Sequence, residues 1–123
     1  MAFLTDRKRA TGMGSAKTGT GHHWAMTVSA GLLLILVPLF IFTFGPILGE
    51  PRAKVVEYYS QPFPSIIAAL TIVVGMLHFK GGVQIMIEDY VHGLARKVLV
   101  IVMVGVSYAV VATGLYGLAE IAF

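Results

Sequence analysis

One histidine stands inside a long apolar stretch. His78 lies ten residues before Glu88, in a run from about 65 to 87 where the other charged residue is Lys80. In a helix, a rise of 1.5 Å per residue puts His78 about 15 Å deeper than Glu88. An ionisable side chain at that depth in a membrane is rare and usually functional, and imidazole is a common haem ligand. The sequence therefore predicts a haem ligand near mid-membrane.

Three glycines would share the helix face that carries His78. At 100° per residue, Gly75 and Gly81 each lie about 60° from His78, and Gly82 lies about 40° away. Such a face would leave room for a flat macrocycle. It would also suit close helix packing, with His78 hydrogen-bonded to a neighbouring helix. Both interpretations remain open on these residues alone.

A six-coordinate haem needs a second axial ligand. The other histidines, His22, His23 and His92, are expected at the cytoplasmic edge, too shallow to share a porphyrin with His78. The chain has no cysteine, which excludes disulfides, thiolate zinc sites and ligands to an iron–sulfur cluster. A haem at His78 therefore predicts an obligate oligomer, whose second ligand comes from another copy of the chain or from a different one.

An acidic and a phenolic residue follow at the end of the same run. Asp89 lies within about 20° of the His78 face and roughly 16 Å along the axis. The phenol of Tyr90 can donate a hydrogen bond to a quinone carbonyl, and the carboxylate beside it can orient an arginine or relay a proton. The alternative is structural, because tyrosines form interfacial belts and acids often end a span.

Three apolar runs must position these residues. They extend over about 24–44, 65–87 and 98–123, and each is long enough for the roughly 20 residues that cross a bilayer. Of the 123 residues, 57% are hydrophobic and 12% charged, against about 25% charged in soluble domains. We therefore expect an all-α membrane protein with three transmembrane helices in a single domain, residues 1–123, and an external loop after the first helix.

The basic residues predict the orientation. Six lysines and arginines fall on the side of the N-terminus, in segments 7–17 and 96–97, and two fall in the loop after the first run. Positive loops stay in the cytoplasm, so residues 1–23 are expected inside and the C-terminus in the periplasm. The N-terminus lacks the apolar core of a signal peptide, so the first run is expected to be retained. The net charge is +3, but the basic residues lie beside the spans, where they set the orientation. Nucleic acid is therefore not expected as a partner.

The sequence from His78 to His92 resembles a known family. The run His78-Phe-Lys-Gly-Gly-Val-Gln-Ile-Met-Ile-Glu88-Asp89-Tyr90-Val-His92 is similar to the signature of the smaller hydrophobic membrane anchor of succinate dehydrogenase. The stretch Gly14-Ser-Ala-Lys-Thr-Gly-Thr-Gly-His22-His23-Trp24 resembles alphaproteobacterial members. With three spans in the same order, the resemblance covers nearly the whole chain.

The resemblance implies specific roles for these residues. His78 would be one axial ligand of haem b, paired with a histidine of the larger cytochrome b anchor. Tyr90 would hydrogen-bond ubiquinone, and Asp89 would support that site. Electrons would come from a flavoprotein through an iron–sulfur subunit. This chain would sit in the bacterial cytoplasmic (inner) membrane among lipids, with no catalytic residue and a contribution to the quinone site only.

One position departs from the family. Members commonly have an arginine near the haem propionates where this chain has Thr27. The larger anchor, His22, His23 or Lys80 would then have to supply the charge. Lys80 is the poorest placed of these, about 200° around the helix from His78, and it could instead face a partner or snorkel to lipid headgroups.

Other functions remain compatible with the sequence. The chain could be a non-catalytic structural subunit in which His78 only packs, or the anchor of a quinol:fumarate reductase. A transporter or channel half would show polar residues along several helices. Only the run 65–87 has them, which disfavours that class.

Overall fold

A computed structural model describes residues 4–12 and 19–123 of the chain. The described residues form helices and no strand. In chain order these are α1 (Asp6–Thr11), α2 (Thr20–Phe44), the short 3₁₀ helix η1 (Gly45–Ile47), α3 (Arg52–Tyr59), α4 (Pro62–Tyr90) and α5 (Gly93–Ala122). Helices α2 with η1, α4 and α5 are long and apolar enough to cross a membrane. The predicted all-α class with three spans is confirmed. Part of the stretch Gly14–Trp24 lies outside the described residues.

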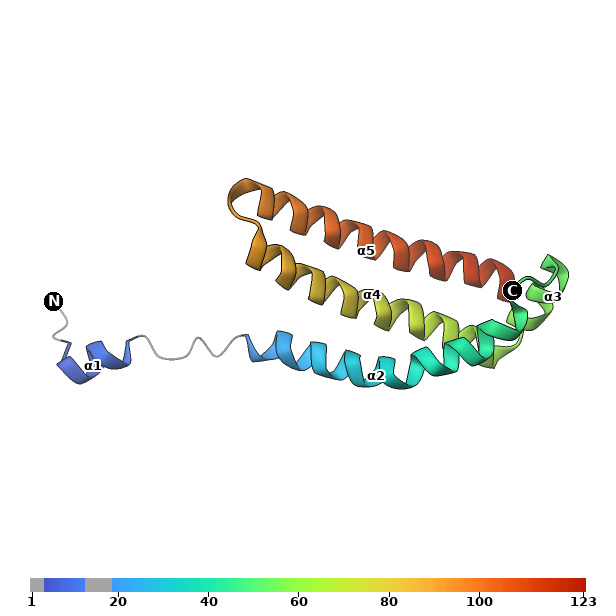
Figure 1. Cartoon of the computed structure of the whole chain (residues 1–123), viewed down its shortest axis with the longest axis horizontal. Coiled ribbons are helices and arrows are strands. Elements are labelled where there is room, and N and C mark those ends of the chain that lie inside the picture. The colour runs from blue at the N-terminus through green and yellow to red at the C-terminus, as the bar shows by residue number, and fades with distance from the viewer. Residues whose placement is uncertain (1–3, 13–18) are drawn as a thin grey trace.

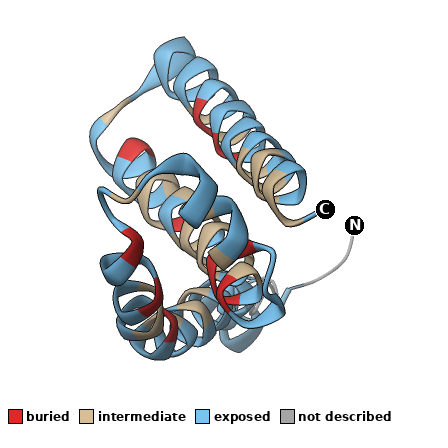
Figure 2. Cartoon of the chain, turned by 90° about the vertical axis from the view of Figure 1, so that its right-hand side faces the viewer, coloured by how far each residue is buried: buried red, intermediate tan, exposed pale blue. Residues whose placement is uncertain are grey.

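The three long helices form a single layer with α4 in the middle (Figures 1 and 2). Helix α4 packs against both α2 and α5, and among the described residues these two outer helices make no contact with each other. The element that carries His78 is thus the one held on two sides. Its position is fixed by more of the chain than that of either neighbour.

Helix α2 continues through Pro38 without a break and curves along its length (Figure 1). Proline cannot donate the backbone hydrogen bond to the residue four positions earlier, which loosens the helix there. The hydroxyl of Thr43 bonds back to the carbonyl oxygens of Leu39 and Phe40, at 2.9 and 3.1 Å, an arrangement that often accompanies bending. The curve carries the end of α2 over α4.

The connection between α2 and α4 is more ordered than a simple loop. After Gly49, whose φ of 83° favours glycine, α3 makes about two turns and packs on α4 and α5. Tyr59, Ile47 and Ala68 form a small buried cluster beneath it. Burial first, and then the neighbouring Tyr58, raises the pKa of the Tyr59 phenol. This cluster closes the end of the bundle opposite Tyr90.

Helices α4 and α5 are joined by a very short turn. Only Val91 and His92 separate them, and Gly93 opens α5 with a φ of 68°. That backbone conformation is strained for any residue with a Cβ, so glycine permits the sharp reversal. The turn places Asp89 and Tyr90 directly beside the start of α5.

The outer surfaces of the layer are strongly apolar and open. Leu34, Phe42 and Ile101 are each more than 70% exposed, and no large side chain among the described residues is fully buried. In water such surfaces would be unfavourable by about 25 cal/mol per Å². Lipid or other membrane helices must therefore cover most of this chain.

Candidate functional site

The centre of the site is a hydrogen bond between α2 and α4. The Ser29 hydroxyl oxygen lies 2.8 Å from Nδ1 of His78, and both side chains are half-buried. The same hydroxyl lies 3.0 Å from the carbonyl oxygen of Met26. The alternative in which His78 is hydrogen-bonded to a neighbouring helix is thus realised, through one of its two ring nitrogens.

The second nitrogen of His78 remains available. Every buried side-chain nitrogen and oxygen in the described chain has a hydrogen-bond partner, and Nε2 of His78 has none there. This nitrogen is therefore accessible from outside the chain. A neutral imidazole that is held through one nitrogen and open at the other is the form that binds a metal.

A stripe of α2 side chains covers the glycine face of α4. The stripe recurs every three or four residues, the spacing of one helix face, and consists of His22, Met26, Ser29 and Leu33. A Cβ added to Gly81 would lie 2.5 Å from the Met26 sulfur, and one on Gly82 would lie 3.8 Å from the Met26 methyl. Within this chain these glycines admit α2, which is the close helix packing that the sequence also allowed.

His22 on α2 contacts the glycine face of α4. Its Cε1 atom is 3.5 Å from the position of a Cβ on Gly81, and Gly81 is less than one helical turn from His78. The structure thus brings His22 against the glycine face of α4, and its expected place at the membrane edge stays a prediction. His22 still cannot share a porphyrin with His78, because Met26 fills the contact between the two helices there and leaves no gap for a macrocycle.

Lys80 lies on the other side of α4. Its ammonium donates a hydrogen bond of 3.3 Å to the Tyr108 hydroxyl and sits 5.1 Å from the centre of that ring. The cation–π contact and the hydrogen bond together stabilise the ammonium charge within the chain, without contact to lipid headgroups. The snorkelling alternative for Lys80 is not what the structure shows, since the side chain pairs with α5. Thr27 donates its hydroxyl to the His23 carbonyl, at 3.0 Å.

Asp89 and Tyr90 end α4 on the surface. Tyr90 is 82% exposed, and neither side chain has a hydrogen-bond partner in the described part of the chain. A hollow of about 490 Å³ lies close by, between the end of α4 and the first turns of α5, and it is lined by Glu88, Arg96, Lys97, Val100 and Ile101. Asp89 and Tyr90 are not among the residues that line this hollow, and both side chains are open to other molecules.

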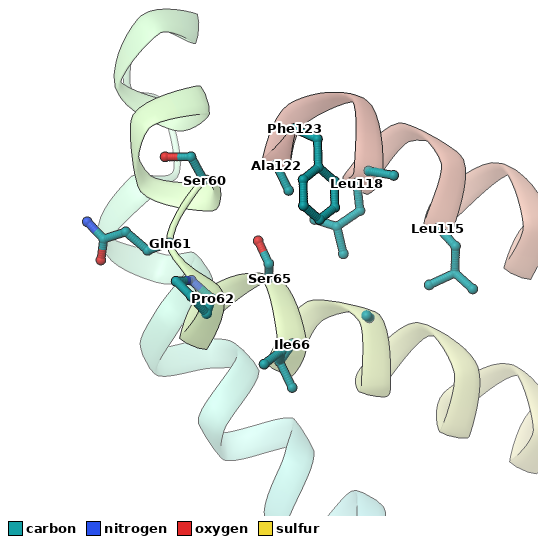
Figure 3. Close-up of a pocket in the computed structure, with 11 residues that line it drawn as sticks. Ser60, Gln61, Pro62, Ser65, Ile66, Leu115, Leu118, Ala122 and Phe123 are labelled. Atoms are coloured by element: carbon teal, nitrogen blue, oxygen red, sulfur yellow. The ribbon is translucent and has the colours of Figure 1, made fainter.

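A second cavity, of about 400 Å³, opens at the opposite end of the bundle between the start of α4 and the end of α5 (Figure 3). Its lining includes Ile66, Leu115, Leu118 and Phe123, and no lining side chain is titratable. The hydroxyl of Ser65, which lies beside it, is bonded to the Tyr59 carbonyl. The lining side chains thus offer no carboxylate, imidazole or amine for proton transfer or metal binding.

Metal binding within this chain would depend on His78. Among the described residues, no three histidine, aspartate or glutamate side chains come together in a way that could hold an ion. A single open imidazole supplies one ligand, which fits a macrocycle that brings four ligands of its own and takes the sixth from another chain.

The fold and the site define a class of protein. It is a small membrane protein with three spanning helices, a half-buried histidine open at one nitrogen inside the middle span, and an exposed Asp-Tyr pair at the end of that span. Residues 2–114 match the family described as succinate dehydrogenase/fumarate reductase transmembrane subunit. The chain belongs to that family, as the resemblance predicted.

Curated relatives agree with the family. The chain is 46% identical over 120 residues to the succinate dehydrogenase hydrophobic membrane anchor subunit of Paracoccus denitrificans, covering 98% of this chain and 93% of that protein. It is 26% identical over 114 residues to the protein of the same name from Rickettsia conorii, with 89% and 90% covered. A succinate dehydrogenase membrane anchor subunit of Reclinomonas americana is 29% identical over 93 residues, with 73% and 78% covered. No solved structure matches the chain. Spans and relatives together make this a multi-pass protein of the bacterial inner membrane.

Proposed function

We propose that this chain is the anchor of a bacterial succinate dehydrogenase that supplies one haem ligand and one wall of the ubiquinone site. The observation that carries the proposal is the His78 side chain, which is fixed at Nδ1 and open at Nε2 inside a membrane span. Haem b, when bound, would supply a one-electron redox centre within the membrane. A purely structural subunit would have no need to hold an imidazole in this way.

His78 would hold the haem iron through Nε2, together with a histidine of the larger cytochrome b anchor. The glycine face of α4 is covered by α2, so these glycines would not be the residues that hold the macrocycle within this chain. His22 is the best placed group in this chain to stand near a propionate, since it reaches the level of Gly81. Lys80 is turned toward α5 and Thr27 carries no charge, which leaves His22, His23 and the larger anchor as sources.

Tyr90 would donate its hydroxyl to a ubiquinone carbonyl, and Asp89 would orient or protonate the same headgroup. Reduction of ubiquinone to ubiquinol takes up two electrons and two protons, so a carboxylate at an exposed helix end suits proton delivery from the aqueous side. Exposure of Tyr90 supports a site completed by partners, which we propose are the larger anchor and the iron–sulfur subunit. The flavoprotein, where succinate is oxidised, would attach through the iron–sulfur subunit.

The test is the visible spectrum of the purified complex. Replacing His78 with alanine should convert a low-spin b-type spectrum to a five-coordinate one or abolish haem binding, because no other group in the described chain is placed to substitute. The matched control is His92→Ala, which removes an exposed histidine at the start of α5 and should leave the spectrum unchanged. An unaltered low-spin spectrum in His78→Ala would refute the proposal, as would a complex that contains no b-type haem.

A further inference from the structure

We infer that Ser29 is a positioning residue that sets the tautomer of His78 and thereby prepares Nε2 to bind iron. The inference rests on the proposed haem ligation and adds a residue from α2 to it. Ser29 does not touch the metal site itself. It acts through the imidazole, from a helix 49 residues away in sequence.

The assignment follows from counting protons. The Ser29 oxygen lies within hydrogen-bond distance of two groups, the Met26 carbonyl at 3.0 Å and His78 Nδ1 at 2.8 Å. A hydroxyl has one proton to donate, and a carbonyl oxygen can only accept. Both contacts are hydrogen bonds at once only if the hydroxyl donates to Met26 and accepts from an Nδ1–H of His78.

That arrangement leaves the Nε2 lone pair free. A neutral imidazole carries one proton, so protonation at Nδ1 means that Nε2 is unprotonated and can bind a metal. The opposite tautomer would put a proton on the accessible nitrogen and leave the Met26 carbonyl without its serine donor. A hydrogen bond from Nδ1–H also fixes the plane of the ring and increases the basicity of the metal-binding nitrogen.

The chain itself shows that a hydroxyl on these helices takes this orientation. Thr43, Thr71 and Thr113 each donate to a carbonyl oxygen three or four residues earlier. Of the hydroxyls that bond back in this way within the described long helices, Ser29 also meets an imidazole. Threonine at position 29 should keep the same oxygen in place, whereas valine, of nearly the same shape, should not.

The experiment compares Ser29→Thr with Ser29→Val and Ser29→Ala in the purified complex. The measurements are the haem midpoint potential and the rate of haem transfer to excess apomyoglobin. Valine and alanine should raise the potential, because a less basic imidazole stabilises ferric iron less, and should speed haem loss about tenfold. Threonine should stay within about twofold of the parent. Alanine is smaller than serine, so it tests the hydroxyl even if valine prevents assembly.

Thr43→Val is the control, since it removes a hydroxyl of α2 that has no histidine partner. A shift in this control as large as that of Ser29→Val would overturn the inference, as would equal potentials and haem loss in the threonine, valine and alanine variants. If His78→Ala changes the haem spectrum while the Ser29 variants keep the potential and haem-loss rate of the parent, only the role of Ser29 is refuted. If His78→Ala keeps the parent spectrum, the proposed function falls with it.

Discussion

The contact between Gly81 and α2 gives a quantitative test of the site's framework. A Cβ at Gly81 would lie 2.5 Å from the Met26 sulfur, whereas ordinary contacts begin at about 3.4 Å. Gly81→Ala therefore requires a displacement of about 0.9 Å, either of the Met26 side chain or of the whole of α2. Overpacking of this kind typically costs about 1 to 3 kcal/mol. The Met26 side chain is flexible, which favours the lower half of that range.

Replacing glycine with alanine also stabilises the helix itself, and this gain must be subtracted from the measured change in unfolding free energy. Alanine is favoured over glycine in a helix by about 1 kcal/mol, and this applies at any interior position. Gly105→Ala on α5 is the matched control, because its Cβ would meet nothing within 4 Å. The difference in unfolding free energy between the two variants then isolates the steric effect, with Gly81→Ala expected to be less stable by about 1 to 2 kcal/mol.

The assay is unfolding by SDS in mixed micelles, followed by the fluorescence of Trp24, the single tryptophan. Gly82→Ala provides a second control on α4, since its nearest contact of 3.8 Å is ordinary, and it should behave like Gly105→Ala. If Gly81→Ala is as stable as Gly105→Ala, then α2 does not press on α4 at this point. The steric explanation of the glycine face would then be wrong.

Two further predictions concern the quinone site and the orientation. Tyr90→Phe should lower succinate-to-ubiquinone activity several-fold, because a hydrogen bond is worth about 0.5 to 1.5 kcal/mol, while activity with an acceptor upstream of the quinone stays unchanged; an equal ratio of the two activities in mutant and parent would reduce Tyr90 to an interfacial residue. A reporter fused after Phe123 should be periplasmic and one inserted after His92 cytoplasmic, and the reverse pattern would move the proposed quinone site to the wrong side of the membrane.

The sequence predicts the spans because runs of about 20 apolar residues have few alternatives. It predicts their ends less well. Helix α4 starts at Pro62, which is favoured in a first turn, and continues through Glu88 to Tyr90, since nothing there breaks a helix. The two turns of α3 replace part of the loop expected after the first span. A helix often continues beyond its apolar run into polar residues, and hydrophobicity alone does not reveal this continuation.

The partner of His78 could not be predicted from hydrophobic periodicity. In a soluble protein the stripe of α2 that contains Met26, Ser29 and Leu33 would stand out from a polar surface. In a membrane the opposite face of the helix is apolar too, so hydrophobicity does not vary around the helix. The register between α2 and α4 then depends on how their side chains fit together. The available signal was Ser29 itself, a hydroxyl in an apolar run at a depth close to that of His78. The pairing of Lys80 with Tyr108 was missed for the same reason.

The two-residue turn between α4 and α5 also affects how the chain is made. Lys80 at the middle of a span opposes insertion of α4 alone by about 2.5 to 3.5 kcal/mol, and His78 adds to this. With only Val91 and His92 between the helices, α5 follows α4 out of the ribosome immediately and brings Tyr108 to Lys80. In the folded chain the contact with Tyr108 offsets part of this cost, so we expect α4 to be more stable in the bilayer with α5 beside it than alone.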